Sequence, residues 1–563
     1  MKRNIFLLAI LLLASTTVGR ACTNFLVGKD ASVDGSTFVT YNMDSYGMYG
    51  ILRSWPAMHH GKGEVRHIVD TDHNRYMGAI PEVENTYSVI GQMNEYQLTI
   101  TESTWTGRVE LVDTTGVIDY VSLMTLGLQR AKTAREAIKV MTDLVAEHGY
   151  ASSGEAFSIA DPNEVWLMEM IGKGPGRKGA VWVAVRIPDD CICAHANQSR
   201  IRQFDQKDKK NVMYSKDVIS FAREQGYFSG KDADFSFSDA YSPTNFHMQR
   251  ACEARVWSFF SKHVDGMERY LDYAKGLDVG ECEPMPLYVR PKHKLSLRDC
   301  MDGMRDHYEG TPFDMTVDCT GGAWNSACRP RPQEWEVDGK TYFHERPIAT
   351  QQSAETMVCQ MRSWLPDAIG GVLWFGNDDA SMVCYTPVYC SATRVPKCYN
   401  SGDASDVKFS WNSAFWVCNW VSNMVYNLYS RMNPDLVKVR ESLQDKYCNA
   451  QRDIEAAALA VYEGKARNDG FEPYRGGNCN VQEYLTKYGE DCAAEMLACW
   501  RELGEFLVVK FTDLSVKQEK GGKFLMNDKN LCMPPLREGY PEQYRRVIVN
   551  ETGDNYLAPQ SNK

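Results

Sequence analysis

Residues 19–44 are GRACTNFLVGKDASVDGSTFVTYNMD, a stretch in which a cysteine closely follows an apolar leader. The leader has a basic start, an apolar run over residues 5–14 and then small polar residues. This is the pattern of a secretory signal peptide, and the apolar run is too short to span a bilayer. Gly19 and Ala21 are the small residues that signal peptidase requires. We therefore expect cleavage after Ala21, a mature chain that begins with Cys22, and export to the periplasm or the extracellular space.

Two other outcomes of processing stay open. A cysteine after an apolar leader can carry a lipid anchor, although such signals place a branched aliphatic residue three positions before it, where this chain has Gly19. The position two before it is small in those signals and is Arg20 here. A lipidated Cys22 would have no free amine, and the chain would then be a lipid-anchored surface binding protein without activity. Cleavage a few residues earlier would leave Cys22 inside the chain.

The mature chain is long, acidic and rich in cysteine. The 563 residues less the 21 of the leader leave 542, enough for one large domain or two. Removal of Lys2, Arg3 and Arg20 changes the net charge from −11 to −14, which argues against nucleic acid as a partner. No second segment has the apolar length of a membrane span. Export permits disulfides among the 18 cysteines, but neither their pairing nor the formation of a homo-oligomer follows from the sequence.

Cys191, Cys193 and His195 are the nearest approach to a cluster of metal ligands. They alternate along a predicted strand and would share one face. No fourth ligand is evident and paired CxxC motifs are absent from the sequence, so we interpret them as buried thiols beside a core histidine. We expect neither a metal nor a cofactor.

Hydrophobic periodicity predicts a mixed architecture of helix and antiparallel sheet. Strands are predicted at Thr37–Tyr41 and Gln97–Thr101, and a helical segment over residues 119–148. Within that segment Thr133 and Glu136 have capping-box spacing, and Gly149 is the expected stop. Three more strands with short connections predict an antiparallel meander, over residues 156–160, 165–171 and 180–187. Helix against antiparallel sheet indicates the α+β class.

Beyond residue 430 helix-forming residues dominate. Asn433-Pro434 is a plausible helix start, and helices are predicted over residues 435–463 and 481–507. We therefore expect a main domain over residues 22–430 and a helical extension over 431–515. Residues 516–563 are expected to be irregular and peripheral.

An amino-terminal Cys22 would combine a nucleophile and a base in one residue. Its α-amine has an ordinary pKa near ~8 and can accept the thiol proton close to neutral pH. The thiolate would attack a carbonyl, and fixed donors would stabilise the oxyanion. By itself, a cysteine after a cleavage site is more often half of a disulfide or an inert thiol.

Further blocks of sequence favour the catalytic interpretation. They follow one another in order: 22–44, 93–95, 152–164, 188–190, 195–198, 305–311 and 345–347. Together they resemble the secreted PepD-type dipeptidases, a family of N-terminal nucleophile (Ntn) hydrolases related to bile-salt hydrolases and penicillin V acylases. The resemblance covers about residues 22–430. It implies a four-layer αββα sandwich and hydrolysis of dipeptides through an acyl-thioester on Cys22. Non-peptide amides, such as N-acyl amino acids or bile-salt conjugates, are the alternative substrates.

The resemblance also implies roles for five side chains. Cys22 matches the nucleophile, and Asp44 matches the aspartate that contacts it in the relatives. Asn94 and Asn197 stand where the relatives have asparagines of the oxyanion region. Arg255 matches an active-site arginine through a short alignment. The structural alternatives are a turn residue for Asp44, a backbone cap for Asn197 and a helix-surface cation for Arg255.

One position departs from the relatives. Many of them have an arginine immediately before the position of Asn42, where this chain has Tyr41. A tyrosine cannot supply the same bidentate cation, so thiolate stabilisation or binding of a substrate carboxylate is expected to differ. His307 invites a catalytic interpretation, but with an amine available as base we interpret it as structural.

Overall fold

The computed structural model describes residues 22–45, 47–71, 74–277, 280–330, 333–465 and 480–559. The predicted signal peptide and its cleavage site at Ala21 lie outside the described residues. Within them, no helix combines the length and the apolar character needed to cross a membrane.

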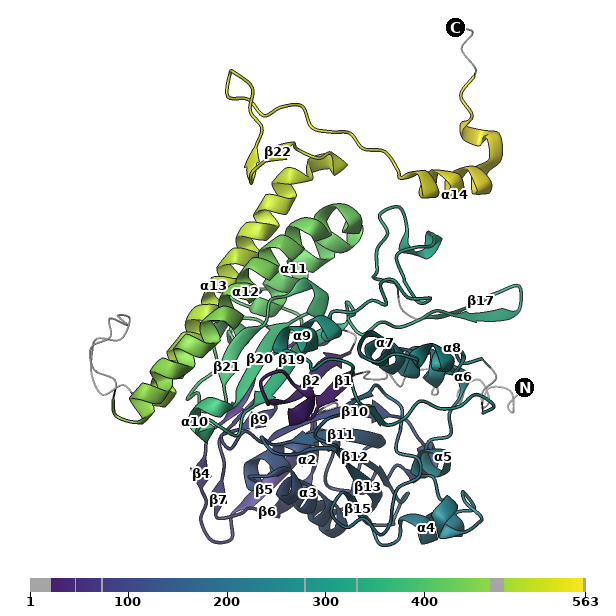
Figure 1. Cartoon of the computed structure of the whole chain (residues 1–563), viewed down its shortest axis with the longest axis vertical. Helices are drawn as coiled ribbons and strands as arrows, with labels where there is room; N and C mark the ends of the chain where they lie inside the picture. The colour runs from purple at the N-terminus through teal and green to yellow at the C-terminus, as the bar shows by residue number, and fades with distance from the viewer. Residues whose placement is uncertain are drawn as a thin grey trace.

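Two antiparallel sheets form the centre of the molecule (Figure 1). The first has seven strands, in the order β16 (Tyr288–Val289), β14 (Ile192–His195), β1 (Asn24–Val27), β2 (Thr37–Asp44), β19 (Ser353–Met361), β20 (Val372–Asn377) and β21 (Thr386–Tyr389). The second has eight, in the order β15 (Val212–Tyr214), β13 (Ala180–Ile187), β12 (Val165–Gly172), β11 (Gly154–Ala160), β10 (Thr99–Trp105), β9 (Met93–Asn94), β8 (Val89–Ile90) and β3 (Ser54–Trp55).

The sheets lie face to face, and helices cover their outer sides. β2 contacts β10 and β11 of the other sheet. On the eight-stranded sheet lie α2 (Tyr120–Arg130) and α3 (Ala134–His148). Against the seven-stranded sheet lie α7 (Ala254–His263), α9 (Leu297–Met304), α11 (Ala414–Asn427), α12 (Tyr429–Tyr462) and α13 (Val481–Lys510). Coverage on both faces explains why every residue of β11, β12, β19 and β20 is buried. The class is α+β, as predicted.

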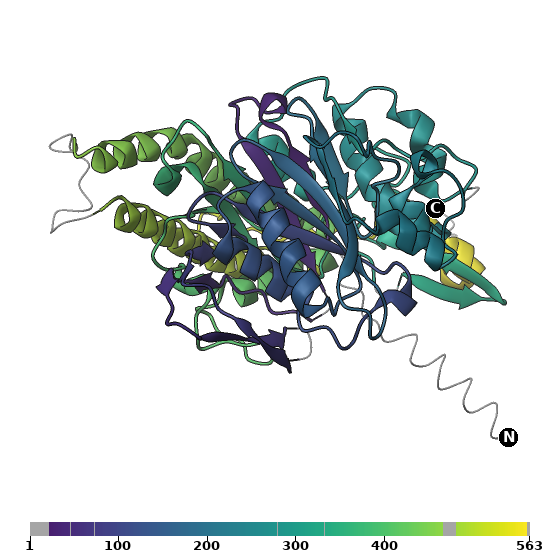
Figure 2. The same cartoon turned by 90° about the horizontal axis from the view of Figure 1, so that it is seen from below.

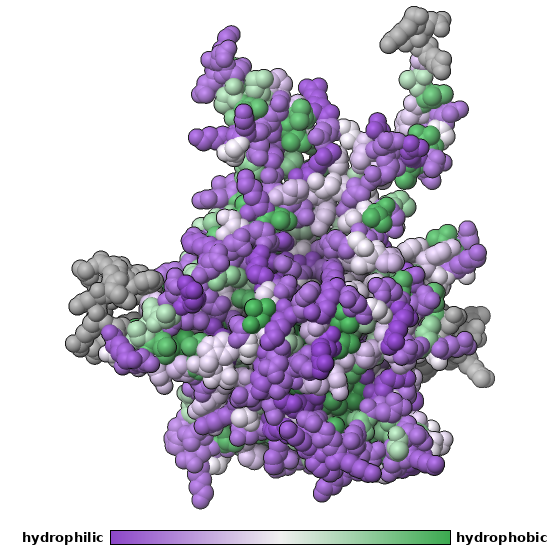
Figure 3. All heavy atoms as spheres, in the orientation of Figure 1, coloured by the Kyte–Doolittle hydropathy of each residue, from purple (hydrophilic) through white to green (hydrophobic). Residues whose placement is uncertain are grey.

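Smaller elements surround this core, and Figure 2 shows the layers from below. Two β-ribbons pair β4 (Met58–His59) with β7 (Asn85–Thr86), and β5 (Val65–Asp70) with β6 (Arg75–Pro81). A third ribbon joins β17 (Glu334–Val337) to β18 (Lys340–Phe343). Short helices are α4 (Val218–Glu224), α5 (Phe237–Tyr241), α6 (Phe246–Met248), α8 (Leu271–Lys275) and α10 (Asp367–Gly370). The face in Figure 3 is largely hydrophilic, with apolar side chains in small separate groups.

The predicted helical segment and meander are observed, with one interruption. The side chain of Thr133 accepts a hydrogen bond from the Glu136 backbone at 3.3 Å and caps α3, which ends at Gly149 with φ of 82°. The chain is extended between α2 and α3, so the regular helix starts after Thr133, as its capping-box spacing predicts, and a separate helix, α2, precedes it. β11, β12 and β13 are consecutive antiparallel neighbours, which confirms the meander.

Two predicted boundaries are wrong. Gln97 has φ of 64°, a left-handed conformation that no strand residue adopts, so β10 begins only at Thr99. α12 begins at Tyr429, and Pro434 lies inside it rather than at its start. In the tail the structure adds a hairpin, β22 (Glu519–Lys520) with β23 (Lys523–Phe524), and the exposed helix α14 (Glu542–Thr552), which Figure 1 places away from the sheets.

Candidate active site

Cys22 lies at the centre of the seven-stranded sheet, directly before β1. Its neighbour Thr23 pairs with Asn42 of β2, through Thr23 N–H to the Asn42 oxygen at 3.2 Å and the reciprocal bond at 3.0 Å. β1 itself lies between β14 and β2. The side chain of Cys22 is fully buried in the full-length chain, where its nitrogen is still a peptide nitrogen. The backbone next to the thiol is thus held by pairing with β2 inside the sheet.

Two side chains contact the Cys22 thiol. Its Sγ donates to Glu102 Oε1 at 3.3 Å and lies 3.6 Å from the Tyr41 hydroxyl. The Tyr41 hydroxyl in turn donates to the same Glu102 oxygen at 2.6 Å. Tyr41 belongs to β2 and Glu102 to β10, so the thiol lies where the two sheets meet. The tyrosine that replaces the arginine of the relatives is therefore a direct neighbour of the predicted nucleophile.

The surroundings of Cys22 favour the protonated thiol. Burial raises the pKa of this thiol well above its ordinary value, and the negative charges of Glu102 and Asp44 raise it further. The backbone N–H of Asp44 and the Tyr41 hydroxyl act in the opposite direction but do not compensate. Deprotonation therefore needs a base placed next to the sulfur.

Arg255 holds the backbone of Cys22. Its Nη1 donates to the Cys22 carbonyl oxygen at 2.9 Å and to Thr23 Oγ1 at 2.8 Å. The residue is fully buried near the start of α7, directly after a π-helical turn over Gln249–Glu253, a distortion frequent at functional sites. The ring of Phe259, in the same helix, stacks on the ring of Phe25 in β1 with 3.8 Å between the ring centroids. This contact packs the helix against the strand. The helix-surface alternative for Arg255 is wrong.

A chain of hydrogen bonds links Arg255 to Asp44. Asn197, with φ of 59°, accepts on its Oδ1 from Arg255 Nη2 at 3.1 Å and from Arg346 Nη1 at 3.3 Å. Arg346 Nη2 forms a buried ion pair with Asp44 Oδ2. Ser353 donates to the other Asp44 oxygen at 2.5 Å. Four of the five predicted residues, Cys22, Arg255, Asn197 and Asp44, are thereby brought together.

Asn94 lies apart from this chain. Its amide nitrogen donates to the carbonyl groups of Leu128 and Ala131, both at 2.8 Å, at the carboxyl end of α2. Its oxygen accepts from the backbone of Tyr96 and Leu98 at 3.0 and 3.1 Å. In the described part of the chain no hydrogen bond joins Asn94 to the other four residues.

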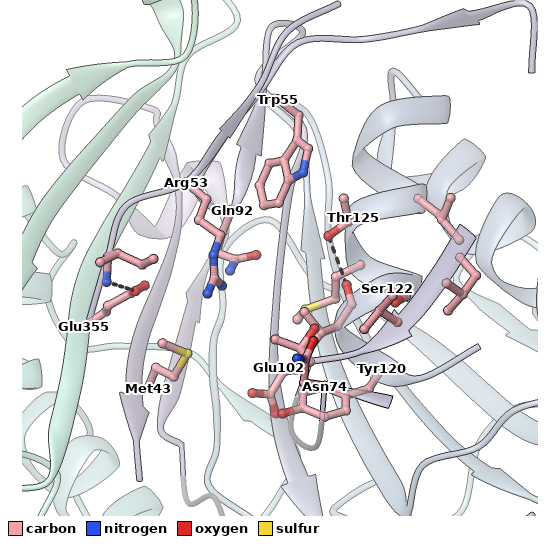
Figure 4. Close-up of a pocket in the computed structure, with 18 of the residues that line it drawn as sticks. Met43, Arg53, Trp55, Asn74, Gln92, Glu102, Tyr120, Ser122, Thr125 and Glu355 are labelled. Atoms are coloured by element: carbon pink, nitrogen blue, oxygen red, sulfur yellow. Dashed lines mark hydrogen bonds between the residues drawn. The ribbon is translucent and has the colours of Figure 1, made fainter. Parts of the chain in front are cut away.

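A cavity of about 540 Å³ lies next to the neighbours of the thiol, although Cys22 itself is fully buried and does not line it. Tyr41 and Glu102, the two side chains in contact with Cys22, form part of its lining. Figure 4 shows the Arg53 guanidinium pointing into the space between the wall with Glu355 and the wall with Glu102. Apolar surface comes from Met43, Trp55 and Met124. The cavity thus combines apolar walls, a cation and buried carboxylates, and two of its lining residues separate it from the Cys22 thiol.

Comparison with known proteins identifies the family. The sequence profile of Peptidase family C69 matches residues 21–54 and 56–442. The chain belongs to peptidase family C69. A probable dipeptidase of Salmonella dublin is 28% identical over 397 residues, 66% of this chain and 81% of that protein. A probable dipeptidase of Latilactobacillus sakei is 26% identical over 475 residues, 80% and 91% of the two chains. Dipeptidase A of Lactobacillus helveticus is 25% identical over 419 residues, 70% and 80%. The predicted relation to PepD-type dipeptidases is confirmed.

Two residues of this C69 peptidase join the site although neither was predicted to have a role there. Arg346 connects Asn197 with Asp44. It lies in the block 345–347 that matches the related dipeptidases, and this match could have marked it as a candidate site residue. Glu102 directly follows the predicted strand Gln97–Thr101. No motif or matched block marked it as a candidate site residue.

His195 belongs to the core of the peptidase. Its ring nitrogens lie 2.6 Å from Ser103 Oγ and 2.7 Å from Ser158 Oγ, and burial lowers its pKa to about 3. The ring is therefore neutral at physiological pH. Both nitrogens are engaged by serines.

Proposed function

We propose that this C69 peptidase is an exported dipeptidase whose nucleophile is Cys22, acting after residues 1–21 are removed. The observation that carries the proposal is the contact of the Cys22 thiol with Tyr41 and Glu102, which also line the cavity. Small-ligand pockets commonly measure about 300–1,000 Å³, so the cavity suits a small substrate. The names of the relatives support a dipeptide in particular.

The proposed reaction uses the freed α-amine of Cys22 as base. The amine takes the thiol proton, and the thiolate adds to the carbonyl carbon of the peptide bond. The ammonium group then returns a proton to the leaving nitrogen as the C–N bond breaks, which leaves a thioester on Cys22. A water molecule, deprotonated by the same amine, cleaves the thioester and regenerates the thiol. The raised pKa of the thiol makes such an adjacent base necessary.

Asn197 is the better candidate of the two asparagines for the oxyanion region. Its oxygen is held by Arg255, which also holds the Cys22 carbonyl, so it lies within the network of the nucleophile. Both asparagines donate to backbone carbonyl groups, Asn94 to Leu128 and Ala131 and Asn197 to Thr104 at 2.6 Å, so the choice rests on the contact of Asn197 with Arg255. We propose that Asn94 supports the site by fixing the turn after β9.

The layered arrangement supports assignment to the Ntn-hydrolase class. Two antiparallel sheets packed between helical layers, with a nucleophile before a central strand, agree with the αββα sandwich that the resemblance implies. We propose residues 22–430 as the catalytic domain and 431–515 as its helical extension.

Hydrolysis assays on the chain that begins at Cys22 test this function. We expect turnover of dipeptides and little turnover of N-acyl amino acids or conjugated bile salts, and no turnover by Cys22→Ala. If the enzyme prefers acylated amino acids, the proposed dipeptide substrate is wrong, but the proposed mechanism through Cys22 stands. Ordinary dipeptide hydrolysis by Cys22→Ala would remove the central claim. Intact mass of the protein recovered from its native host tests processing, because added acyl mass on Cys22 would support the lipid-anchored alternative.

A further inference from the structure

Three metal-ligating side chains meet at a point outside the active-site network. His307 lies in the loop after α9, Cys328 lies before the β17–β18 ribbon, and Asp379 caps the short helix Ala380–Met382. One ligand atom from each lies within 4.8 Å of the other two. These residues come from separate segments of the sequence, so no contiguous motif announces the cluster.

The His307 ring is oriented toward this point by a carboxylate. Its Nδ1 lies 3.1 Å from Glu309 Oε1, and the His307 backbone N–H donates to Glu309 Oε2 at 2.8 Å. The ring is 1% exposed, and its Nε2 has no hydrogen-bond partner in the described part of the chain. A carboxylate on one nitrogen and an open second nitrogen are the arrangement of metal-binding histidines, because the carboxylate fixes the tautomer.

The other two ligands are also held in place. Asp379 is fully buried and accepts from the Ser381 hydroxyl at 2.8 Å and from the Tyr426 hydroxyl at 2.9 Å. Burial raises the pKa of the Cys328 thiol well above its ordinary value, and the Asp379 carboxylate raises it further. A cation beside the sulfur would reverse both effects, since a metal stabilises the thiolate.

We propose that Cys328 Sγ, His307 Nε2 and a carboxylate oxygen of Asp379 bind one zinc ion, with water as the fourth ligand. Thiolate, imidazole and carboxylate are the three ligand types that zinc accepts in tetrahedral sites, whereas calcium and magnesium take oxygen ligands. The thiolate and the carboxylate together balance the two positive charges. Binding displaces the Cys328 proton to solvent.

The site would stabilise the loop next to the catalytic network. Asp306 accepts from Ser258 of α7, the helix of Arg255, at 2.5 Å. The Tyr308 hydroxyl donates to the carbonyl group of Arg346. A zinc ion on His307 would therefore fix both neighbours.

A different account of the same residues needs no metal. Burial by itself lowers the pKa of His307, but Glu309, Asp379 and Asp306 raise it above the ordinary value. A protonated ring could then pair with Glu309 alone. In that state its second N–H would be buried without an acceptor in the described part of the chain, which is unfavourable. The two accounts differ in whether the protein holds a metal.

Metal analysis and cobalt substitution of the whole mature chain distinguish them. The chain is purified without chelators in the Cys22→Ala background, so that the active-site thiol cannot be the ligand. We expect about one zinc per chain, and after exchange for cobalt a thiolate-to-cobalt charge-transfer band. The band and the zinc should be lost in Cys328→Ser and in His307→Gln. They should persist in the matched control Cys384→Ser, which removes a buried thiol outside the cluster.

The spectrum of the Cys22→Ala parent protein keeps the test decisive even if a further variant fails to fold. Removal of zinc by a chelator should lower the unfolding temperature of the parent protein and leave that of folded Asp379→Asn nearly unchanged. A folded parent protein with zinc below about a tenth per chain and no cobalt band would overturn the proposal. A cobalt band that survives in folded Cys328→Ser would overturn the ligand assignment. Dipeptide hydrolysis plays no part in these readouts, so the outcome is independent of the proposed function.

Discussion

The Arg255 guanidinium donates a hydrogen bond to the carbonyl oxygen of Cys22 at 2.9 Å. The same side chain bonds to Thr23 at 2.8 Å and to Asn197 at 3.1 Å. One buried arginine thus fixes the backbone of the proposed nucleophile and the side chain proposed for the oxyanion region. Its geometry, and not only its charge, is what the site requires.

Arg255→Lys should therefore lower kcat/KM by about 10²-fold or more. A lysine ammonium cannot reproduce the planar set of donors of the guanidinium, so the backbone of Cys22 would shift. The unfolding temperature should also fall. The matched control is Arg362→Lys, a buried arginine bonded to Glu455 at 2.6 Å and to the Gly370 carbonyl at 2.9 Å. The control should lose stability but keep its kcat/KM. Equal loss of turnover in both folded variants would reduce Arg255 to a general stabilising residue.

The ion pair between Arg346 and Asp44 predicts a double-mutant result. Arg346→Met deprives a fully buried carboxylate of its cation and should reduce the free energy of unfolding by about 3–5 kcal/mol. Adding Asp44→Asn removes the buried charge and should restore part of that stability without restoring activity. Urea denaturation and dipeptide hydrolysis measure the two effects. Additive losses of stability in the double variant would show that the pair is not coupled.

Glu102 and Tyr41 should shift the pKa of Cys22 in opposite directions. Glu102→Gln removes a charge that raises this pKa, so the thiol should become reactive at lower pH. Tyr41→Phe removes a hydroxyl that lowers it, so reactivity should begin at higher pH. Alkylation of the Cys22 peptide, followed by mass spectrometry across a pH series, measures both. If both variants shift the pKa of Cys22 in the same direction, the opposing roles of Glu102 and Tyr41 are contradicted.

The sequence predicts local features of this fold better than distant ones. The meander of β11–β13 follows from periodicity and short turns, and the Thr133 cap from spacing alone. The pairing of β2 with β19 joins Asp44 to Ser353, and no local pattern reveals it. β10 was misplaced at its start because the polar Gln97 extends the alternation of Leu98 and Ile100, although its backbone is left-handed.

The candidate site divides in the same way. Cys22, Asp44 and Asn197 were named through matched blocks and Arg255 through a short alignment, and each of these is a local pattern. Arg346 was missed as a participant because its partner Asp44 is 302 positions away. Glu102 was missed because its role depends on the packing of one sheet on the other. Contacts between residues far apart in the chain produce no local hydrophobic pattern, so a single sequence does not reveal them.

The two asparagines should respond differently to alanine. Asn197→Ala should lower kcat by about 10²–10³ with a smaller change in KM, because an oxyanion donor acts in the transition state. Asn94→Ala should mainly lower stability, since it leaves the Leu128 and Ala131 carbonyl groups without their donor. Steady-state kinetics and thermal unfolding separate the two effects. A kcat of Asn197→Ala within about threefold of wild type would favour the backbone-capping alternative.

The last prediction concerns the base. If the α-amine of Cys22 accepts the thiol proton, any residue before it converts the amine into an amide with no basicity near neutral pH. A chain expressed without the leader, but with one uncleaved glycine before Cys22, should fold and be inactive although its thiol is intact. The competing base is Glu102, whose Oε1 lies 3.3 Å from the sulfur and which would be indifferent to the extension. Glycine keeps steric obstruction small.

The comparison needs one matched variant. Glu102→Gln in the chain that begins at Cys22 should retain turnover if the amine is the base, and lose it if the carboxylate is. If the glycine-extended chain is inactive and Glu102→Gln is active, the α-amine is the base that accepts the thiol proton. The reverse pair of results assigns it to Glu102. Near-normal turnover of the extended chain, with the glycine still attached by mass spectrometry, would show that Cys22 does not work as an N-terminal nucleophile.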